Sequence, residues 1–231
     1  MVTVASLSDL AFHPVTGYRL VNSKFPPIPL FDDVADAEEL DAVYEIQRLT
    51  NPRLQNEIGN LNLLPRNQIP FGIDGLPYAV ASFTHVNPNG SRFSTGDFGV
   101  MYIADNSETA LAEVAHHQQT YWGKVEDLAY DRFVFRELCC DFITEKYKCI
   151  EANDETKGLL APDDYSQSQQ LGRELRQSGI EGLRYPSVRL EGGQCFGLFS
   201  PKTVKRVVQA KHYEMVYREG ALQVNQLLQP R

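Results

Sequence analysis

Hydrophobic and polar positions along this chain follow two periods, one typical of strands and one typical of helices. Residues 17–23 alternate as a half-buried strand does, and residues 98–104 are almost wholly apolar, which favours a strand covered on both faces. Apolar residues recur at every third position from Leu40 to Leu49. The segment 33–50 is therefore predicted to form an amphipathic helix.

Start and stop signals indicate further elements. Asp105 with Glu108 three residues later resembles a capping box and predicts a helix from about Asn106 to Gln118. A second helix is predicted to end at Gly179. That helix covers residues 163–179, and strands are expected within residues 79–86, 128–142, 147–151, 180–186 and 194–200. Residues 203–217 fit a strand and a helix equally well.

Helices and strands are interleaved irregularly, without repeated βαβ units. This pattern favours an α+β fold with a mixed, largely antiparallel sheet. Residues 56–78 are rich in Asn, Gly and Pro and resemble a long irregular connection, a kind of segment that is often functional. The pattern has no internal repeat and no domain boundary, so residues 1–231 are expected to form a single domain, with a frayed tail at about 219–231.

The charge of the chain argues against direct nucleic-acid binding. Asp and Glu number 30 against 22 Lys and Arg, a net charge of −8, whereas duplex binding needs a large basic surface. The four cysteines contain no C-x-x-C pair and are expected to be reduced thiols, and the histidines lack the spacing of metal ligands. Without a signal peptide or an apolar run of ~20 residues, a cytoplasmic protein with no membrane contact is expected.

Three polar side chains recur within the turn, strand and helix predicted for residues 92–113, namely Arg92, Tyr102 and Glu113. The Tyr102 hydroxyl would need a polar partner if the strand is buried. Glu113 points away from the apolar stripe of its helix and shares a face with His117 one turn later. Periodicity leaves open whether that face meets water or a cleft. We assign His117 no role, because a solvated histidine is the commoner case.

The segment GSRFSTGDFGVMYIADNSETALAEVAHH resembles the signature of the RES domain, a family named for an arginine, a glutamate and a serine. This resemblance assigns Arg92, Tyr102 and Glu113 to the signature. Upstream, YRL with Arg19 is similar to the opening strand of the family. Downstream, GIEGLRYPSVRLEGGQCFGLFSP is similar to its serine block and assigns Ser187.

This sequence departs from the family pattern at two places. GSRFS stands where many members have Gly-Gly-Arg-Trp-Asn, and a longer stretch separates Arg19 from Arg92 than in compact members. We therefore expect one RES-type domain, with recognisable blocks over residues 17–201 and an irregular insertion at about 24–87. Arg53 within that insertion is an alternative to Arg19 as the second substrate arginine.

The resemblance implies a toxin of a bacterial toxin–antitoxin module with an ADP-ribosyltransferase-like fold. Such toxins use NAD⁺ as substrate, without a metal, and remove nicotinamide by hydrolysis or phosphorolysis; an Xre-type antitoxin blocks the site. ADP-ribosylation of a protein at the same site and a non-catalytic regulatory role stay open as alternatives. The acceptor, water or phosphate, and homo-oligomerisation also stay open.

In that setting the resemblance gives each residue an expected role. Glu113 would stabilise positive charge on the ribose or hold a ribose hydroxyl, and Tyr102 would stack on nicotinamide. Arg92 and Arg19 would bind the pyrophosphate, which suits the planar fork of a guanidinium. Ser187 would contact the nicotinamide amide or a ribose hydroxyl. The expected catalytic residues are Glu113, Tyr102 and Arg92, and the expected substrate-binding residues are Arg19, Arg92, Tyr102 and Ser187.

Overall fold

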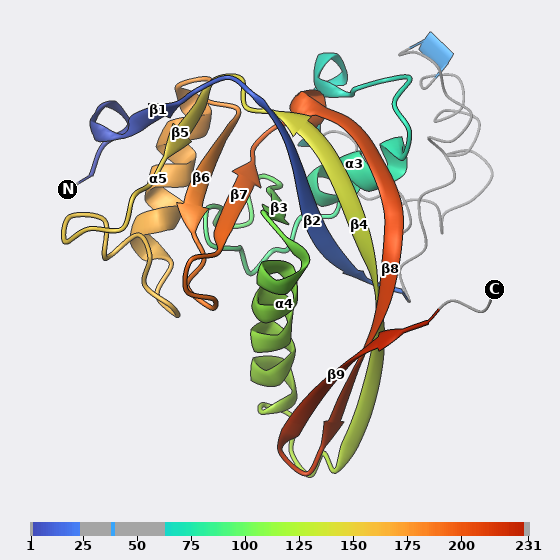
Figure 1. Ribbon diagram of the computed structural model, residues 1–231. Coiled ribbons are helices and arrows are strands. Elements are labelled where there is room, and N and C mark those ends of the chain that lie inside the picture. The colour runs from blue at the N-terminus through green and yellow to red at the C-terminus, as the bar shows by residue number, and fades with distance from the viewer. Residues whose placement is uncertain (1, 24–37, 40–62, 229–231) are drawn as a thin grey trace.

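The computed structural model describes residues 2–23, 38–39 and 63–228. In these residues nine strands form one sheet in the order β1-β5-β6-β7-β3-β2-β4-β8-β9, and all neighbours are antiparallel except β5 and β6 (Figure 1). The strands are β1 (Ser8–Leu10), β2 (Pro14–Asn22), β3 (Met101–Ala104), β4 (Tyr130–Ile143), β5 (Tyr147–Cys149), β6 (Gly182–Pro186), β7 (Gln194–Leu198), β8 (Val204–Arg218) and β9 (Ala221–Leu227). The helices are α3 (Leu76–Thr84), α4 (Ser107–Trp122) and α5 (Ser166–Gln177), and the 3₁₀ turns are η1 (Val4–Ser6), η4 (Arg66–Gln68) and η5 (Pro201–Thr203). The predicted α+β fold with a mixed, largely antiparallel sheet is confirmed.

Alternating side chains along β3 show how the sheet is covered on both faces. Met101 and Ile103 pack in a cluster with residues of α3. Tyr102 packs with residues of α5, and Ala104 packs with residues of α4. Burial on both faces explains the apolar run, although the regular strand begins only at Met101.

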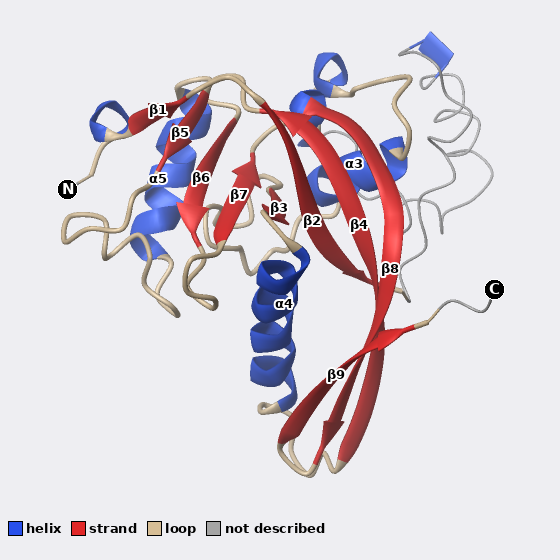
Figure 2. Ribbon diagram, in the orientation of Figure 1, coloured by secondary structure: helices blue, strands red, loops and turns tan. Residues whose placement is uncertain are grey.

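The long strands β4 and β8 continue with β9 as an arm, and α4 lies along it (Figures 1 and 2). Trp122, the last residue of α4, is fully buried. Its Nε1 donates a hydrogen bond to Oδ2 of Asp131 at 2.7 Å, and its ring lies 5.3 Å from Phe133 and 5.4 Å from Tyr217. These contacts anchor the end of α4 to the arm. No helix in the described part of the chain combines the length and the apolar character needed to span a lipid bilayer.

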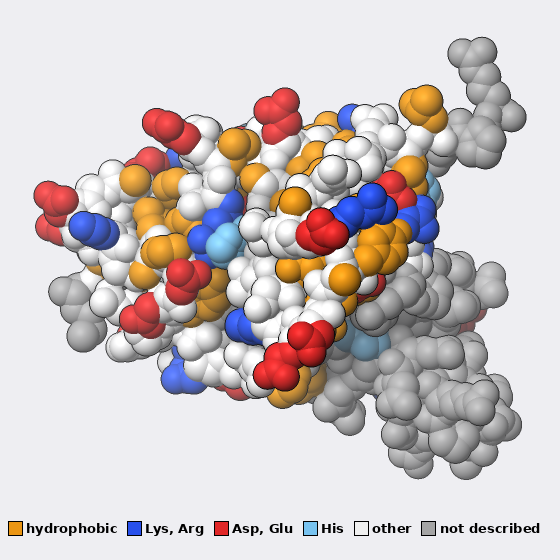
Figure 3. Space-filling model, turned by 90° about the horizontal axis from the view of Figure 1, so that it is seen from below, with side chains coloured by type: hydrophobic (Ala, Val, Ile, Leu, Met, Phe, Trp, Pro, Cys, Tyr) orange, Lys and Arg blue, Asp and Glu red, His pale blue; other side chains and the backbone are white. Residues whose placement is uncertain are grey.

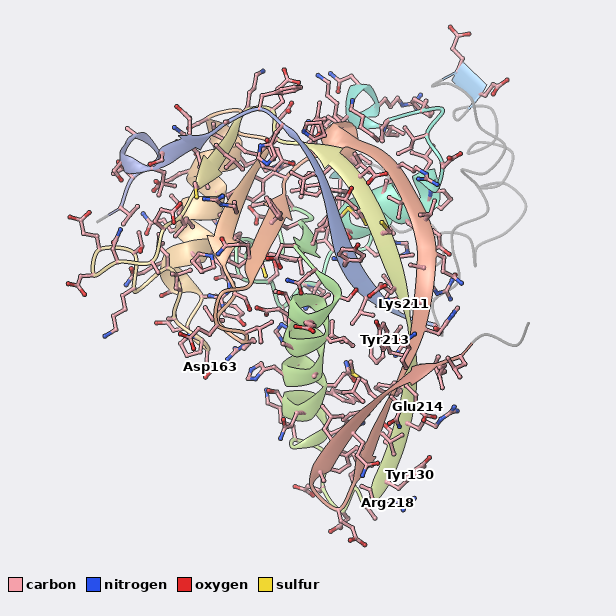
Figure 4. All side chains as sticks on the ribbon, in the orientation of Figure 1. Tyr130, Asp163, Lys211, Tyr213, Glu214 and Arg218 are labelled. Atoms are coloured by element: carbon pink, nitrogen blue, oxygen red, sulfur yellow. The ribbon has the colours of Figure 1, made fainter. Side chains whose placement is uncertain are left out.

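The chain end is more ordered than the sequence predicts. The sequence predicts a frayed tail from about residue 219, but residues 221–227 form β9. Every residue of β9 pairs with a residue in the 212–218 part of β8. Near the turn between these strands, the guanidinium group of Arg218 lies 5.7 Å from the ring centre of Tyr130 (Figure 4). Backbone pairing with β8 explains this order, which the short and mixed pattern of residues 221–227 did not predict.

The prediction of a strand over residues 79–86 is wrong, because residues 76–84 form α3. Gly75 adopts the left-handed conformation, with φ of 74°, and Pro77 lies in the first helical turn; together they start a helix. Buried apolar side chains then follow at helical spacing: Leu76, Ala79, Val80 and Phe83. The helix start at Gly75 and Pro77 lies outside residues 79–86, the only segment considered for the strand, and was therefore missed.

The start of α4 also differs from the prediction. Its N-cap is Asn106, whose side chain accepts a hydrogen bond from the backbone N–H of Thr109 at 2.8 Å, so the expected Asp105–Glu108 box is one residue early. The ambiguous residues 203–217 lie largely in β8, because this stretch pairs with β4 on one side and β9 on the other.

Part of the expected insertion lies outside the described residues. Arg53 and most of the helix expected over residues 33–50 belong to that part, although Glu38 and Glu39 are helical. The described portion of residues 24–87 contains η4 and α3, so it is not irregular throughout.

Candidate active site

The sheet opens between β2 and β3, which pair at a single register position, Tyr18 opposite Ala104. Beyond this position Nη1 of Arg19 donates a hydrogen bond to the carbonyl oxygen of Tyr102 at 2.8 Å. A cavity of ≈ 490 Å³ lies at the opening, lined by residues of β2, β3, α4 and the turn that precedes β3. It brings together four residues singled out in the sequence: Arg19, Arg92, Tyr102 and Glu113.

Ser187, the fifth of these residues, holds the carboxylate of Glu113. Its Oγ donates a hydrogen bond to Oε1 of Glu113 at 2.6 Å and accepts from the backbone N–H groups of Arg189 and Leu190, each at 3.1 Å. Because a hydroxyl has one hydrogen and both amides point at its oxygen, that hydrogen is directed to Glu113. Oε2 of Glu113 has no hydrogen-bond partner in the described part of the chain and is the oxygen left for a ligand.

The Tyr102 hydroxyl is occupied by the turn before β3. It lies 2.8 Å from Oγ of Ser91 and accepts a hydrogen bond from the backbone N–H of Phe93 at 3.0 Å. Burial raises the pKa of Tyr102 to about 12, so the phenol keeps its proton at neutral pH. The ring of Tyr102, rather than its hydroxyl, is therefore the part that a ligand would meet.

Arg92 is 8% exposed, and a loop beyond β5 holds its guanidinium group. Nη1 donates to the carbonyl oxygens of Ala161 at 2.9 Å and Leu159 at 3.3 Å, and the group lies 4.6 Å from the ring centre of Tyr165. Its other two nitrogens make no hydrogen bond to the described residues. They remain available to an anion.

Arg19 contributes a second guanidinium group from the opposite strand. Burial lowers the pKa of Arg19, but an arginine side chain stays charged at neutral pH. One of its nitrogens binds the Tyr102 carbonyl. The cavity is therefore lined by one arginine from β2, one arginine from the turn before β3, and the carboxylate-bearing Glu113 of α4.

The lining residues that were given no role from the sequence include His117, Tyr165, Tyr185 and Cys195. His117 had a detectable signal, because it lies one turn after Glu113 on the same helical face. The remaining three gave none, since tertiary packing alone brings them to the cavity. Cys195 has its Sγ 3.8 Å from Oε1 of Glu113, and burial raises the pKa of its thiol well above the ordinary value.

Two other features of the described residues bear on function, namely metal-ligating side chains and basic surface. Among the described residues, no group of three or more His, Cys, Asp and Glu side chains could hold a metal ion. Figure 3, which views the molecule from below, shows Lys and Arg side chains interspersed with Asp and Glu over the described part of that face. The described part of that face therefore carries no extended basic surface.

Three comparisons relate this chain to known proteins. The family described as RES domain matches residues 69–218, a range that contains Arg92, Tyr102, Glu113 and Ser187. Protein y4oC of Sinorhizobium fredii (strain NBRC 101917 / NGR234) is 26% identical over 203 residues, which cover 87% of this chain and 82% of the relative. The crystal structure of the M. tuberculosis MbcT–MbcA toxin–antitoxin complex is similar with a TM-score of 0.41 and 15% identity, covering 53% of this chain and 73% of that one.

Proposed function

This chain belongs to the RES domain family, and from that premise we propose that it is a toxin that degrades NAD⁺ by cleaving the nicotinamide–ribose bond. The observation that carries the proposal is the carboxylate of Glu113, with Oε1 fixed by Ser187 and Oε2 left free at a cavity that also holds two arginines. Water or phosphate would accept the ribosyl group.

The chemistry of this bond explains why a fixed carboxylate would help. As the bond breaks, positive charge develops on the ribose, as in other glycosyl transfers. At about 4 Å and an effective dielectric near 20, a carboxylate attracts that charge by about 4 kcal/mol. Such an attraction corresponds to roughly a thousandfold in rate. A carboxylate held before the reaction needs little reorganisation, which makes its effect larger than that of a mobile one.

The other residues would position the substrate. The free nitrogens of Arg92 and Arg19 would bind the pyrophosphate, and the ring of Tyr102 would stack on nicotinamide. A cavity of ≈ 490 Å³ lies within the usual range of ligand sites, about 300–1,000 Å³. Ser187 would act through Glu113, because a direct contact with substrate, as expected from the resemblance, would require one of its three hydrogen bonds to break.

The proposal includes a cellular setting. The enzyme would act in the cytoplasm, and a cognate Xre-type antitoxin would cover the cavity. The net charge of −8 favours association with a basic partner.

Nicotinamide release from NAD⁺ tests the proposal. The purified protein is incubated with NAD⁺, with and without phosphate, and Glu113→Gln is compared with Glu108→Gln, a change at an exposed residue on the same helix. We expect release by the wild type, a loss of roughly a thousandfold for Glu113→Gln, and no loss for Glu108→Gln.

Other results would point elsewhere. Release only when a protein acceptor is present and gains mass would indicate an ADP-ribosyltransferase. No release under either condition would refute the proposed activity and leave the non-catalytic alternative. A Glu113→Gln variant as active as the wild type would refute the role of the carboxylate.

A further inference from the structure

Hydrolysis at this cavity requires a group that takes a proton from the attacking water. Most ionisable side chains lining the cavity are phenols, a thiol and guanidinium groups, which keep their protons at neutral pH. Burial raises the pKa of the phenols of Tyr102 and Tyr185 and of the thiol of Cys195, so these three groups hold their protons still more firmly. Two bases remain among the lining residues, namely Glu113 and His117.

Glu113 is committed elsewhere. Its Oε1 receives the Ser187 hydrogen bond, and in the proposed function its Oε2 faces the ribose. A carboxylate that stabilises the developing cation loses that effect if it takes up a proton. The second base is therefore the better proton acceptor.

His117 has the position that such a base needs. It follows Glu113 by one helical turn, so both side chains lie on the same face of α4. The residue lines the cavity and is also exposed to solvent, so it lies where the cavity opens. Neither ring nitrogen has a hydrogen-bond partner among the residues that the structure describes. A water molecule in the cavity and bulk solvent outside could both reach the imidazole.

The surroundings keep this imidazole neutral. Burial by the walls of the cavity lowers the pKa of His117, and the charges of His116 on the same helix, Arg189 beyond β6 and Arg92 before β3 act in the same direction. Glu113 opposes them by attraction. At neutral pH the ring is therefore in the form that can accept a proton.

We propose that His117 is the general base that activates water in the hydrolytic reaction. This inference rests on the proposed function. The bond between the ribose carbon and the nicotinamide nitrogen breaks, and its electron pair neutralises the pyridinium. The water oxygen bonds to the ribose carbon, and one water proton passes to a ring nitrogen of His117, which then releases it to solvent. The dianion of inorganic phosphate carries no proton that must leave, so phosphorolysis does not need this base.

The difference between the two acceptors gives the test. Nicotinamide release by wild type and His117→Gln is measured from about pH 5 to 9, first in phosphate-free buffer and then with saturating phosphate. His116→Gln is the matched control, because His116 is the preceding residue on α4 but does not line the cavity. Thermal unfolding checks that each variant is folded.

We expect the wild-type rate of hydrolysis to fall with decreasing pH, and the midpoint of the fall should lie below 6.5, because the pKa of His117 is lower than its ordinary value. His117→Gln should lower hydrolysis by about 10²-fold or more and abolish that dependence, because general base catalysis contributes about 10²–10⁴-fold. Its rate with saturating phosphate should stay near that of wild type. Added imidazole should restore part of the hydrolysis in His117→Ala, and His116→Gln should keep the wild-type rate of hydrolysis at neutral pH.

Several results would overturn the inference while leaving NAD⁺ cleavage intact. These are an unchanged pH profile in folded His117→Gln, an equal loss with water and with phosphate, or a wild type that uses phosphate alone. A wild type that releases no nicotinamide at all would instead remove the proposed function, and this inference with it.

Discussion

At the scale of single residues, the Ser187 hydroxyl makes three hydrogen bonds to the protein itself. It accepts from two backbone amides of its own loop and donates to a carboxylate on α4. The loop after β6 is thereby connected to the helix after β3, two segments far apart in the chain. The orientation of Glu113 depends on this connection.

Removing that hydroxyl gives a prediction at this scale. Ser187→Ala removes the hydroxyl that donates to Oε1 of Glu113 and accepts from two backbone N–H groups. A hydrogen bond to a charged group contributes about 1.5–3 kcal/mol. We expect nicotinamide release to fall about 10- to 150-fold, chiefly in kcat, with the fold retained. Steady-state kinetics and circular dichroism measure both effects.

The control for this variant is Ser200→Ala. Ser200 is buried and, like Ser187, accepts a hydrogen bond at Oγ from a backbone N–H, here that of Lys202, but it does not line the cavity. The Ser200→Ala variant should be less stable than the wild type but equally active. Equal rates for Ser187→Ala and wild type would contradict the positioning role.

At the scale of elements, the helix α5 determines where Arg92 lies. Gly172 in α5 packs directly on the turn before β3, and a Cβ at this position would collide with the carbonyl group of Phe93. Phe93 follows Arg92, so the close approach of helix and turn determines where the backbone that carries Arg92 lies. Only glycine permits this approach.

Gly172→Ala tests that contact. Alanine normally favours a helix over glycine, by about 1 kcal/mol. Here overpacking against backbone should outweigh that gain, at a cost of about 1–3 kcal/mol. We expect a lower midpoint in urea unfolding and a raised KM for NAD⁺. Gly123→Ala, at the end of α4 with an ordinary helical φ of −64°, should be nearly neutral, and the same result for Gly172→Ala would refute the packing argument.

The sequence predicted the helices and strands whose start signals lie close to them in the chain. Tyr102 and Glu113 lie in a strand and a helix whose start signals are close in sequence, so their placement on adjoining elements could be foreseen. Tyr165 and Tyr185 could not, because a loop held by Arg92 and a separate strand bring them to the cavity. The strand predicted over residues 79–86 was wrong for a related reason: the start of α3 at Gly75 lies outside that segment.

At the scale of the whole molecule, stability should depend on pH through the histidines of α4. Burial lowers the pKa of both His116 and His117 below the ordinary value of about 6.5. The unfolded chain therefore binds protons that the folded protein does not, and the free energy of unfolding decreases as pH falls below about 6.5. Urea unfolding at about pH 7.5 and 5.5 measures the decrease. The double variant His116→Gln/His117→Gln should lose less free energy of unfolding over this pH range than the wild type. An equal loss in variant and wild type would contradict the role of these two histidines.

The single register pair between β2 and β3 divides the sheet into two groups of strands that share little backbone hydrogen bonding. Arg19 belongs to one group and Arg92 adjoins the other, whereas α4, which carries Glu113, contacts both. A substrate gripped from both sides would act as a temporary cross-link between the groups. Cleavage cuts that cross-link in two, so the reaction itself would loosen the protein around its products and help them to leave.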